Sequence, residues 1–139
     1  MANNGGMSRS TLEEVISRTP FAVWIGAQIT HYEPGVVELT VPLRPDLTMH
    51  QGIAHGAVIG FVADSACAWA AASVAGEVVT AEYKMNLLAP ATGERLVGRG
   101  EVIQASRRPV VCRADVHAIK QGETRLVATA LATVAVFRA

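Results

Sequence analysis

The sequence carries no excess of charge of either sign. Its 139 residues include 12 Lys and Arg and 12 Asp and Glu, so the formal net charge is zero with histidine neutral. A chain without a basic surplus is not drawn to nucleic acid or to an acidic membrane surface by its overall charge. We therefore expect neither nucleic acid nor a membrane among its partners. Low charge beside a 50% hydrophobic composition favours self-association instead.

Cysteine is scarce, and a targeting segment is lacking. Cys67 and Cys112 share no spacing typical of a zinc site or of a disulfide framework. We expect no metal ion. The first six residues are polar and have no apolar core of the kind found in a signal peptide. Both observations favour a reducing cytoplasm as the compartment.

The length of the chain suits one domain with a core of its own. We expect residues 1–19 to form a tail and a short helix, which begins at Ser10 or Thr11 and ends before Pro20. Residues 20–139 are expected to form the domain proper, opening with a short apolar turn over 21–26.

Small apolar residues are abundant and concentrate in the stretch 55–72. Alanine dominates there, proline is absent, and bulky side chains recur at near-helical intervals. The only charged residue between Gly56 and Gly76 is Asp64. A lone carboxylate is costly to bury in an apolar helix unless it has a partner or a task. We therefore expect a long buried helix with Gly76 as its C-cap, and Asp64 requires an explanation.

The remainder is patterned as strands. Residues 27–32 and 36–42 flank the turn signal Glu33-Pro34-Gly35, which predicts a hairpin. Further strands are expected at 78–88, 96–105, 110–119 and 126–137. Short links between them favour antiparallel pairing, and alternate residues from Leu126 to Val136 would turn small side chains toward the helix. One buried helix with such strands predicts an α+β protein in which a curved sheet wraps around the helix.

The start of the long helix is suited to acyl transfer. A helix N-terminus presents unpaired backbone N–H groups and a partial positive charge. Gly56 has no side chain, so a carbonyl that becomes an oxyanion can approach its N–H closely. A carboxylate aimed at the same carbonyl could act as a nucleophile or as a general base on water.

Helix geometry separates the Asp64 carboxylate from the N–H groups at the start of the helix. Asp64 lies nine residues beyond His55, which is about 13 Å along the axis and roughly half a turn out of phase. It cannot reach a carbonyl held at the tip of its own helix. If both groups serve one reaction, Asp64 must come from a second subunit, and a two-fold dimer would hold two equivalent sites.

The residues at this helix resemble a known signature. His55-Gly56, followed by Asp64 eight residues after the glycine and then by Ser65-Ala66, looks like the motif of hotdog-fold acyl-CoA thioesterases of the phenylacetic-acid-degradation type. The stretch 80–91, TAEYKMNLLAPA, is similar to the next strand of that family. The resemblance covers most of residues 20–137 and implies the hotdog fold, a curved antiparallel sheet around one long central helix.

The resemblance also implies roles. Asp64 takes the place of the catalytic carboxylate, Gly56 that of the oxyanion donor, and Thr80 that of a hydroxyl that helps hold the attacking water. The implied substrate is an aryl-acyl- or medium-chain acyl-CoA, with coenzyme A as part of the substrate and no separate cofactor. The implied assembly is a homodimer that pairs again into a tetramer. We expect these further residues to bind substrate: Gln51, His50, Ala57, Phe61, Arg107 and Arg108.

One position departs from the family. Its members often carry Asn six residues before the His, near the substrate carbonyl, whereas this chain has Met49. His50 and Gln51 are the candidates to replace that amide.

Several assignments have a plainer alternative. Asp64 could be a structural carboxylate that pairs with a partner helix, and Thr80 could be only a strand former. His55 is expected among the catalytic residues, where it would orient the substrate, but it could equally well only cap the helix. Arg107 and Arg108 could be solvated turn residues rather than ligands of the coenzyme A phosphates.

The activity has alternatives too. A hydratase or dehydratase of the same fold would act on hydroxyacyl thioesters, and that class usually pairs a catalytic His with Asp or Glu at a different spacing. A non-catalytic acyl-CoA binder would keep the site without the chemistry. The acyl group stays open, since aromatic and medium aliphatic chains would both suit the apolar candidates Phe21, Trp24, Phe61 and Trp69.

Overall fold

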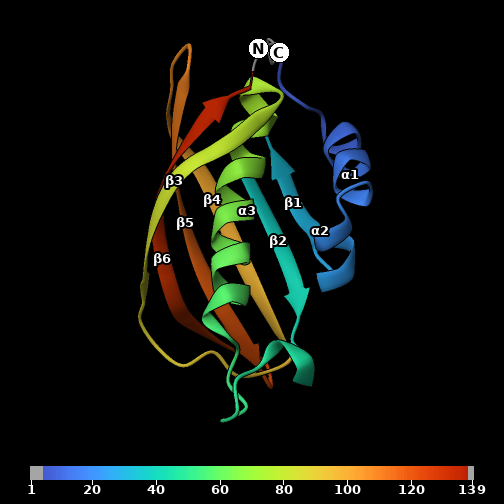
Figure 1. The fold of residues 1–139 in the computed structure, drawn as a ribbon, viewed down its shortest axis with the longest axis vertical. Coiled ribbons are helices and arrows are strands. Elements are labelled where there is room, and N and C mark those ends of the chain that lie inside the picture. The colour runs from blue at the N-terminus through green and yellow to red at the C-terminus, as the bar shows by residue number, and fades with distance from the viewer. Residues whose placement is uncertain (1–4, 138–139) are drawn as a thin grey trace.

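The computed structural model describes residues 5–137, which form a six-stranded antiparallel sheet curved around one long helix (Figure 1). The strand order is β1-β2-β4-β5-β6-β3. This arrangement is the predicted hotdog fold, and its α+β class is confirmed. The elements in chain order are α1 (Arg9–Ser17), α2 (Pro20–Ile25), β1 (Gln28–Glu33), β2 (Val36–Pro42), the short 3-10 helix η1 (Pro45–Leu47), α3 (Gly56–Ala75), β3 (Val78–Leu87), β4 (Arg95–Ala105), β5 (Pro109–Lys120) and β6 (Glu123–Val136).

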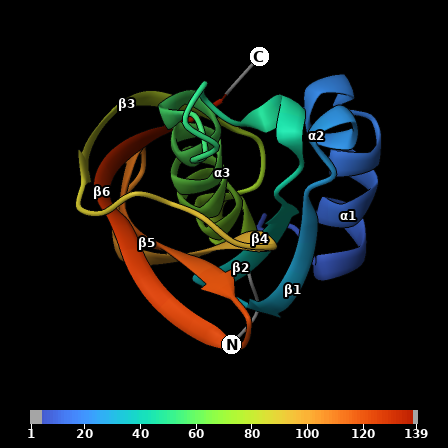
Figure 2. The ribbon, with the colours of Figure 1, turned by 90° about the horizontal axis from the view of Figure 1, so that it is seen from below.

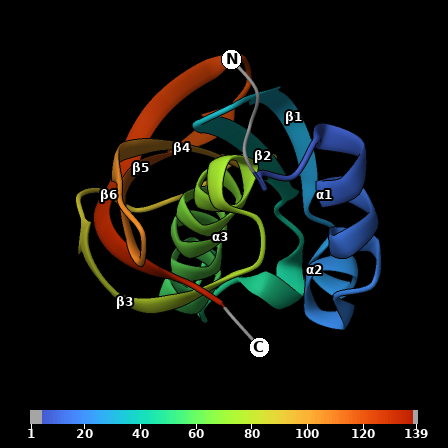
Figure 3. The same cartoon turned by 90° about the horizontal axis from the view of Figure 1, so that it is seen from above.

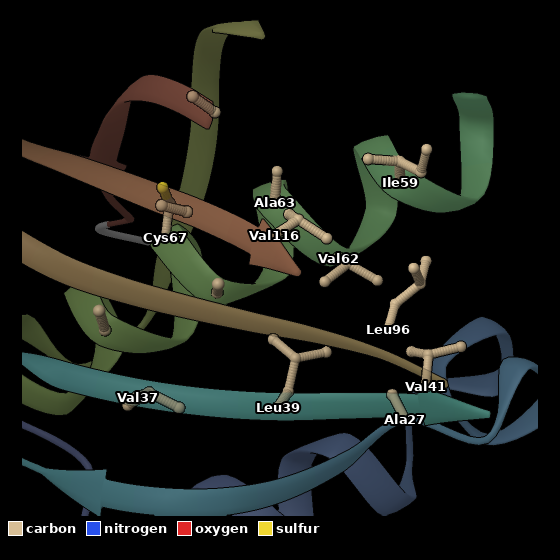
Figure 4. Close-up of a cluster of buried hydrophobic side chains, with 14 of the residues drawn as sticks. Ala27, Val37, Leu39, Val41, Ile59, Val62, Ala63, Cys67, Leu96 and Val116 are labelled. Carbon is tan, nitrogen blue, oxygen red and sulfur yellow. The ribbon is translucent and has the colours of Figure 1, made fainter. Parts of the chain in front are cut away.

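The central helix α3 runs without interruption through the hollow of the sheet, as the view along it shows (Figure 2). Its side chains interdigitate with the inward rows of the strands, where Val62 of the helix meets Leu39 and Leu96 (Figure 4). All three are fully buried. Burial of this apolar surface is the main force that holds the helix to the sheet. By length and composition α3 could cross a membrane, yet 67% of its apolar window is buried within the protein.

The helix lies closest to β4, and two glycines make this possible. A Cβ atom at Gly98 would lie 2.5 Å from Cγ1 of Val62, and one at Gly100 would collide with the carbonyl of Ala66. Any larger residue would push the helix off the sheet. The sequence suggested that small side chains of the last strand would set this approach. Ala128 and its alternate neighbours are indeed buried, but the glycines of β4 decide the closest contact.

The predicted inward face of β6 is wrong at its first residue, Leu126. Leu126 was expected to face the helix, but its side chain is 41% exposed, whereas Val127 is fully buried. The cause is a register shift in the β5–β6 pair: Val116 lies opposite Ala128, and His117 lies opposite Leu126. Val127 is therefore an extra residue, and such a bulge reverses the alternation before it. From Ala128 onward the predicted alternation holds.

The N-terminal segment differs from its predicted form in two details. The first helix begins at Arg9, because the Ser8 side chain accepts a hydrogen bond from the Thr11 N–H and acts as the N-cap. Residues 20–25 form the short helix α2 rather than a turn. Pro20 stands in its first turn, and Gly26 ends it in the left-handed conformation with φ 81°.

Helices α1 and α2 lie beside β1, on the opposite side of the molecule from β3 (Figure 3). Leu12 and Ile16 of α1 are buried in the same core as the strands. The Arg9 guanidinium donates to the Ile29 carbonyl at 3.2 Å and so ties α1 to that edge of the sheet. No comparable element covers β3 within residues 5–137.

Candidate active site

One face of α3 is covered by β3, and the residues on it are spaced four apart. Gly56, Gly60 and Asp64 therefore stack above one another along the helix. We call these three residues the site face of α3. Strand β3 crosses this face from Thr80, at Asp64, to Leu87, whose Cδ1 would lie 3.7 Å from a Cβ at Gly56.

Asp64 is half-buried and held by a neighbour from β3. The Thr80 hydroxyl donates a hydrogen bond to Asp64 Oδ1, with 2.6 Å between the oxygens. Within residues 5–137 no other side chain donates to this carboxylate, so Oδ2 is available to a ligand or water. The family resemblance implies that the Thr80 hydroxyl helps hold the water, and in the structure this hydroxyl is bonded to the Asp64 carboxylate itself.

At the N-terminus of α3, the backbone N–H of Gly56 has no acceptor within residues 5–137. His55 is the N-cap: its Nδ1 accepts from the Ala57 N–H at 2.9 Å, and its carbonyl accepts from Val58 and Ile59. The helix dipole adds positive potential at this point, so the Gly56 N–H is suited to a carbonyl oxygen that gains charge.

The role of His55 as a helix cap is thus visible in the structure. Because Nδ1 accepts a hydrogen bond, a neutral ring carries its proton on Nε2. The ring therefore offers a donor, not a base, toward anything bound beside the helix tip.

Two pockets flank the helix tip. The first, of about 360 Å³, contains the Gly56 backbone and is otherwise lined by apolar residues: Met49, Ile53, Ala54, Ile59 and 87–91. The second, of about 230 Å³, lies on the other side and is lined by Phe21, Trp24, Ile25, Asp46, Leu47, Thr48, His55, Ala57 and Val58. A carbonyl bound at Gly56 would have an apolar recess on either side of it.

Met49 lines the Gly56 pocket, so an apolar side chain stands where the family often has an amide. His50 and Gln51 occupy the exposed turn that the Gly52 N–H closes on the Met49 carbonyl. Neither of them lines the Gly56 pocket.

Three of the four aromatic candidates gather beside the second pocket. The Phe21 ring lies 5.3 Å from that of Phe61, edge to face, and 5.7 Å from that of Trp24. The Arg44 guanidinium stacks 4.6 Å from the centre of the Trp24 ring. Trp69 lies elsewhere, in a pocket with residues of α1 near the other end of α3.

Arg107 and Arg108 lie in the exposed turn between β4 and β5. Strand β4 runs in the same direction as α3, because Gly98 lies against Val62 and Gly100 lies against Ala66. The end of β4 is therefore near the C-terminus of α3. This turn and the α3 N-terminus are therefore at opposite ends of the subunit (Figure 1). Within one chain the structure does not bring these arginines to Gly56.

The cysteines are not nucleophiles. Burial, followed by the charges of Cys112 and Asp64, raises the pKa of the Cys67 thiol far above its ordinary value. Burial raises the pKa of the Cys112 thiol to about 12. Both are free thiols that stay protonated at neutral pH, which makes them unreactive. Among residues 5–137, no group of three or more His, Cys, Asp and Glu side chains could hold a metal ion.

The continuous helix keeps Gly56 and Asp64 apart. Eight residues of α-helix span about 12 Å, and α3 is unbroken between them. Within one chain the Gly56 N–H and the Asp64 carboxylate therefore cannot act on the same carbonyl.

A family model described as the thioesterase superfamily matches residues 51–125, which include α3 and the strands from β3 to β5. The chain belongs to the thioesterase superfamily. Membership supports a thioester hydrolase. No curated protein matches the chain significantly.

Solved structures of this superfamily resemble the chain closely. A thioesterase family protein from Silicibacter pomeroyi shares 38% sequence identity and a TM-score of 0.87, over 89% of this chain and 93% of that one. A mutant of the phenylacetic acid degradation protein PaaI from Thermus thermophilus shares 29% identity and a TM-score of 0.75, over 85% and 99%. A thioesterase from Haemophilus influenzae shares the fold, with 21% identity and a TM-score of 0.81 over 95% and 92%.

Two residues of the site region, Gly60 and Tyr83, are not among those predicted from the sequence. Gly60 lies midway on the site face, and Tyr83 of β3 lies against it, with its Oη 2.9 Å from where a Cβ of Gly60 would be. The four-residue spacing of Gly56, Gly60 and Asp64 was a visible signal. The approach of Tyr83 was not, because it depends on a bulge in β3.

Proposed function

We propose that this thioesterase hydrolyses an aryl-acyl- or medium-chain acyl-CoA and acts as a two-fold dimer with two equivalent sites. The observation that carries the proposal is the hydrogen bond from Thr80 to Asp64. It holds a half-buried carboxylate on the same helix face that ends in the free Gly56 N–H. Coenzyme A enters as part of the substrate, and the reaction requires no cofactor.

The dimer is proposed to form along β3. This strand pairs with β6 on one side, and its other edge is free within residues 5–137. Val79, Leu87 and Leu88 are more than half exposed. A long edge strand with apolar side chains is a surface that proteins normally cover. A second copy placed against it would bring two α3 helices together.

Two-fold symmetry fixes the level of the axis. If Asp64 of the partner subunit faces Gly56, then Asp64 of the first subunit faces the other Gly56, since an isologous interface is self-complementary. The axis then passes midway between these residues, level with Gly60. Gly60 and Tyr83 of both copies would lie beside it.

Hydrolysis would proceed by general-base catalysis. The Gly56 N–H and the helix dipole polarise the thioester carbonyl, whose oxygen gains charge as water attacks the carbon. Asp64 of the partner subunit takes the proton from that water, while Thr80 keeps the carboxylate in place. Collapse of the intermediate breaks the C–S bond. The products are a carboxylic acid and the thiolate of coenzyme A, which recovers a proton.

The pockets at the helix tip support this substrate class. Both recesses are mainly apolar, and the second carries a cluster of Phe21, Trp24 and Phe61. A phenyl ring or a medium alkyl chain suits such a surface, whereas a charged acyl group would lose solvation there. The similarity to a phenylacetic acid degradation protein favours the aromatic choice.

The direct test is release of free thiol from a panel of acyl-CoA esters. We expect turnover with phenylacetyl- and medium-chain esters and little with a dicarboxylic acyl-CoA. Interconversion of enoyl- and hydroxyacyl-CoA without thiol release would instead indicate a hydratase. Binding of acyl-CoA with neither reaction would indicate a non-catalytic binder.

The shared site is tested by mixing two inactive variants, Asp64→Asn and Gly56→Val. Random exchange of subunits makes half of the dimers mixed, and each mixed dimer has one intact site, so about a quarter of the wild-type activity should return. Mass spectrometry confirms the exchange. Mixed dimers without activity would contradict a site built from two subunits.

The role of the carboxylate is tested by a single turnover in ¹⁸O-labelled water. General-base catalysis sends the label into the product acid and leaves the peptide that contains Asp64 unlabelled. Direct attack by Asp64 would form an acyl-enzyme anhydride. Water that opens this anhydride at the Asp64 carbonyl leaves label on that residue, so label on Asp64 would show direct attack.

A further inference from the structure

Strand β3 changes phase directly after Thr80. Thr80 pairs with Val134 and Glu82 with Thr133, so Ala81 is an extra residue in β3. Strict alternation would turn Glu82 inward beside Thr80. The bulge instead leaves Glu82 on the outer face, where the Thr133 hydroxyl donates to it at 2.8 Å, and turns Tyr83 toward α3. The chain thus presents Thr80 and Tyr83 as successive inward residues.

Gly60 makes room for the Tyr83 hydroxyl. A Cβ at position 60 would lie 2.9 Å from Tyr83 Oη, but 3.9 Å from Cζ of the same ring. The first distance is shorter than real Cβ contacts allow, and the second is ordinary contact. The glycine therefore accommodates the hydroxyl specifically, rather than the ring.

Among residues 5–137 the Tyr83 hydroxyl has no hydrogen-bond partner, and the Tyr83 side chain is 41% exposed. The next inward residues of β3, Met85 and Leu87, are apolar. Thr80 is already engaged with Asp64. Tyr83 is therefore the one uncommitted side-chain hydroxyl between Thr80 and Leu87 on the helix side of the described strand.

We propose that Tyr83 holds the water that attacks the thioester, together with Asp64 of its own chain. The inference rests on the proposed thioesterase function. Tyr83 Oη lies beside Gly60. Gly60 is about one helical turn before Asp64, and the rise along the helix between these two residues is about 6 Å. The Asp64 side chain leans back toward Gly60, as helical side chains do. One water with two hydrogen bonds of about 2.8 Å each spans such a gap.

This arrangement orients the nucleophile. The water donates one hydrogen bond to Asp64 Oδ2 and the other to Tyr83 Oη, so its free electron pair is turned toward the carbonyl carbon. Asp64 takes the first proton as the C–O bond forms. Tyr83 keeps its own proton throughout and fixes only the direction of attack.

The first test replaces Tyr83 by Phe, which keeps the ring and removes the hydroxyl. We expect kcat for phenylacetyl-CoA to fall about 10- to 30-fold with KM within about twofold, because positioning of water matters in the transition state and not in substrate binding. The matched control is Tyr32→Phe, whose hydroxyl donates to the Met7 carbonyl far from the site face. We expect that control to keep wild-type kcat.

The second test uses Gly60→Ala in a double-mutant cycle. The added methyl group should displace the Tyr83 hydroxyl and lower kcat about as much as Tyr83→Phe does. In the Tyr83→Phe background the same methyl meets no oxygen, so it should cost nothing further. Independent, multiplicative losses in the double variant would overturn the inference.

Two outcomes separate this inference from the proposed function. If the wild type releases thiol, Asp64→Asn does not, and Tyr83→Phe keeps full kcat as a stable dimer, then Tyr83 holds no water and the thioesterase assignment stands. If the wild type releases no thiol from any ester, the proposed function is wrong and the inference is wrong with it.

Discussion

The two edges of the sheet differ in how the chain covers them. At β1, helices α1 and α2 lie alongside, and the Arg9 guanidinium binds the Ile29 carbonyl. At β3, nothing within residues 5–137 covers the outer edge. Every residue from Val79 to Leu88 is exposed except Thr80 and Met85, which are partly buried. The chain itself covers the β1 edge, whereas the β3 edge is free within residues 5–137.

The difference is instructive because the site residues lie at the unfinished edge. Thr80 and Tyr83 belong to β3, and they contact the site face of α3. The elements that complete the β1 edge contribute an apolar wall through Phe21 and Trp24. The open edge of the sheet thus coincides with the candidate site, in which Gly56 and Asp64 of one chain lie too far apart to act on one carbonyl. Substitutions at both edges test whether this coincidence reflects a shared site.

The largest effect is expected from Asp64→Asn. The amide oxygen can still accept the Thr80 hydrogen bond, but the side chain can no longer take a proton, so kcat should fall by about 10³-fold or more. The matched control is Asp115→Asn, because Asp115 also accepts from a threonine, Thr129, on the outer face of the sheet. Rates of thiol release and thermal unfolding are measured for both. Near-wild-type turnover by Asp64→Asn would remove the carboxylate from the mechanism.

Thr80→Val should have the next largest effect. It removes the donor that holds Asp64 and leaves the strand intact, so we expect kcat to fall about 10- to 100-fold, as for loss of a hydrogen bond to a charged group. Thr129→Val removes an equivalent bond of 2.8 Å to Asp115. That control should keep its kcat. Equal rates for the two variants would mean that Thr80 has only a structural role.

The two edges of the sheet can be compared directly by introducing a glutamate at each of them. Val79 of β3 is 55% exposed and Val23 of α2 is 57% exposed, so the same substitution starts from nearly equal exposure. We expect Val79→Glu to weaken dimerisation about tenfold, because charge discourages the pairing of edge strands. Val23→Glu should leave it unchanged. Light scattering over a dilution series measures both, and a reversed order would place the dimer interface at the β1 side.

The smallest effect is expected at the turn between β4 and β5. Within one chain this turn lies far from the N-terminus of α3. In the proposed two-fold dimer the α3 helices would run antiparallel, so the turn would approach the N-terminus of α3 in the partner subunit. Replacing Arg107 and Arg108 together by Ala should raise KM for CoA esters a few-fold, and leave KM unchanged for short thioesters that lack the nucleotide. Equal KM changes for the two substrate types would show that these arginines are only solvated.

Much of the fold was predictable because its signals are local. The Ala-rich stretch with its single carboxylate predicted α3, and the Glu33-Pro34-Gly35 turn predicted the first hairpin; both are confirmed. Errors arose where pairing changes the phase of a strand. Leu126 was assigned to the wrong face, because the bulge at Val127 depends on the register with β5.

In the candidate site, too, some features are set by local sequence and others only by the tertiary structure. By itself the sequence determined that His55, Gly56 and Asp64 lie on one helix, and that helix length keeps the last two apart, since rise per residue is a local constant. Only the tertiary structure decided which side chains meet that helix. The bond from Thr80 to Asp64 and the contact of Tyr83 with Gly60 depend on where β3 crosses α3 and on the bulge at Ala81. Contacts between distant segments are set by the register of a whole sheet, and no single stretch of sequence carries that information.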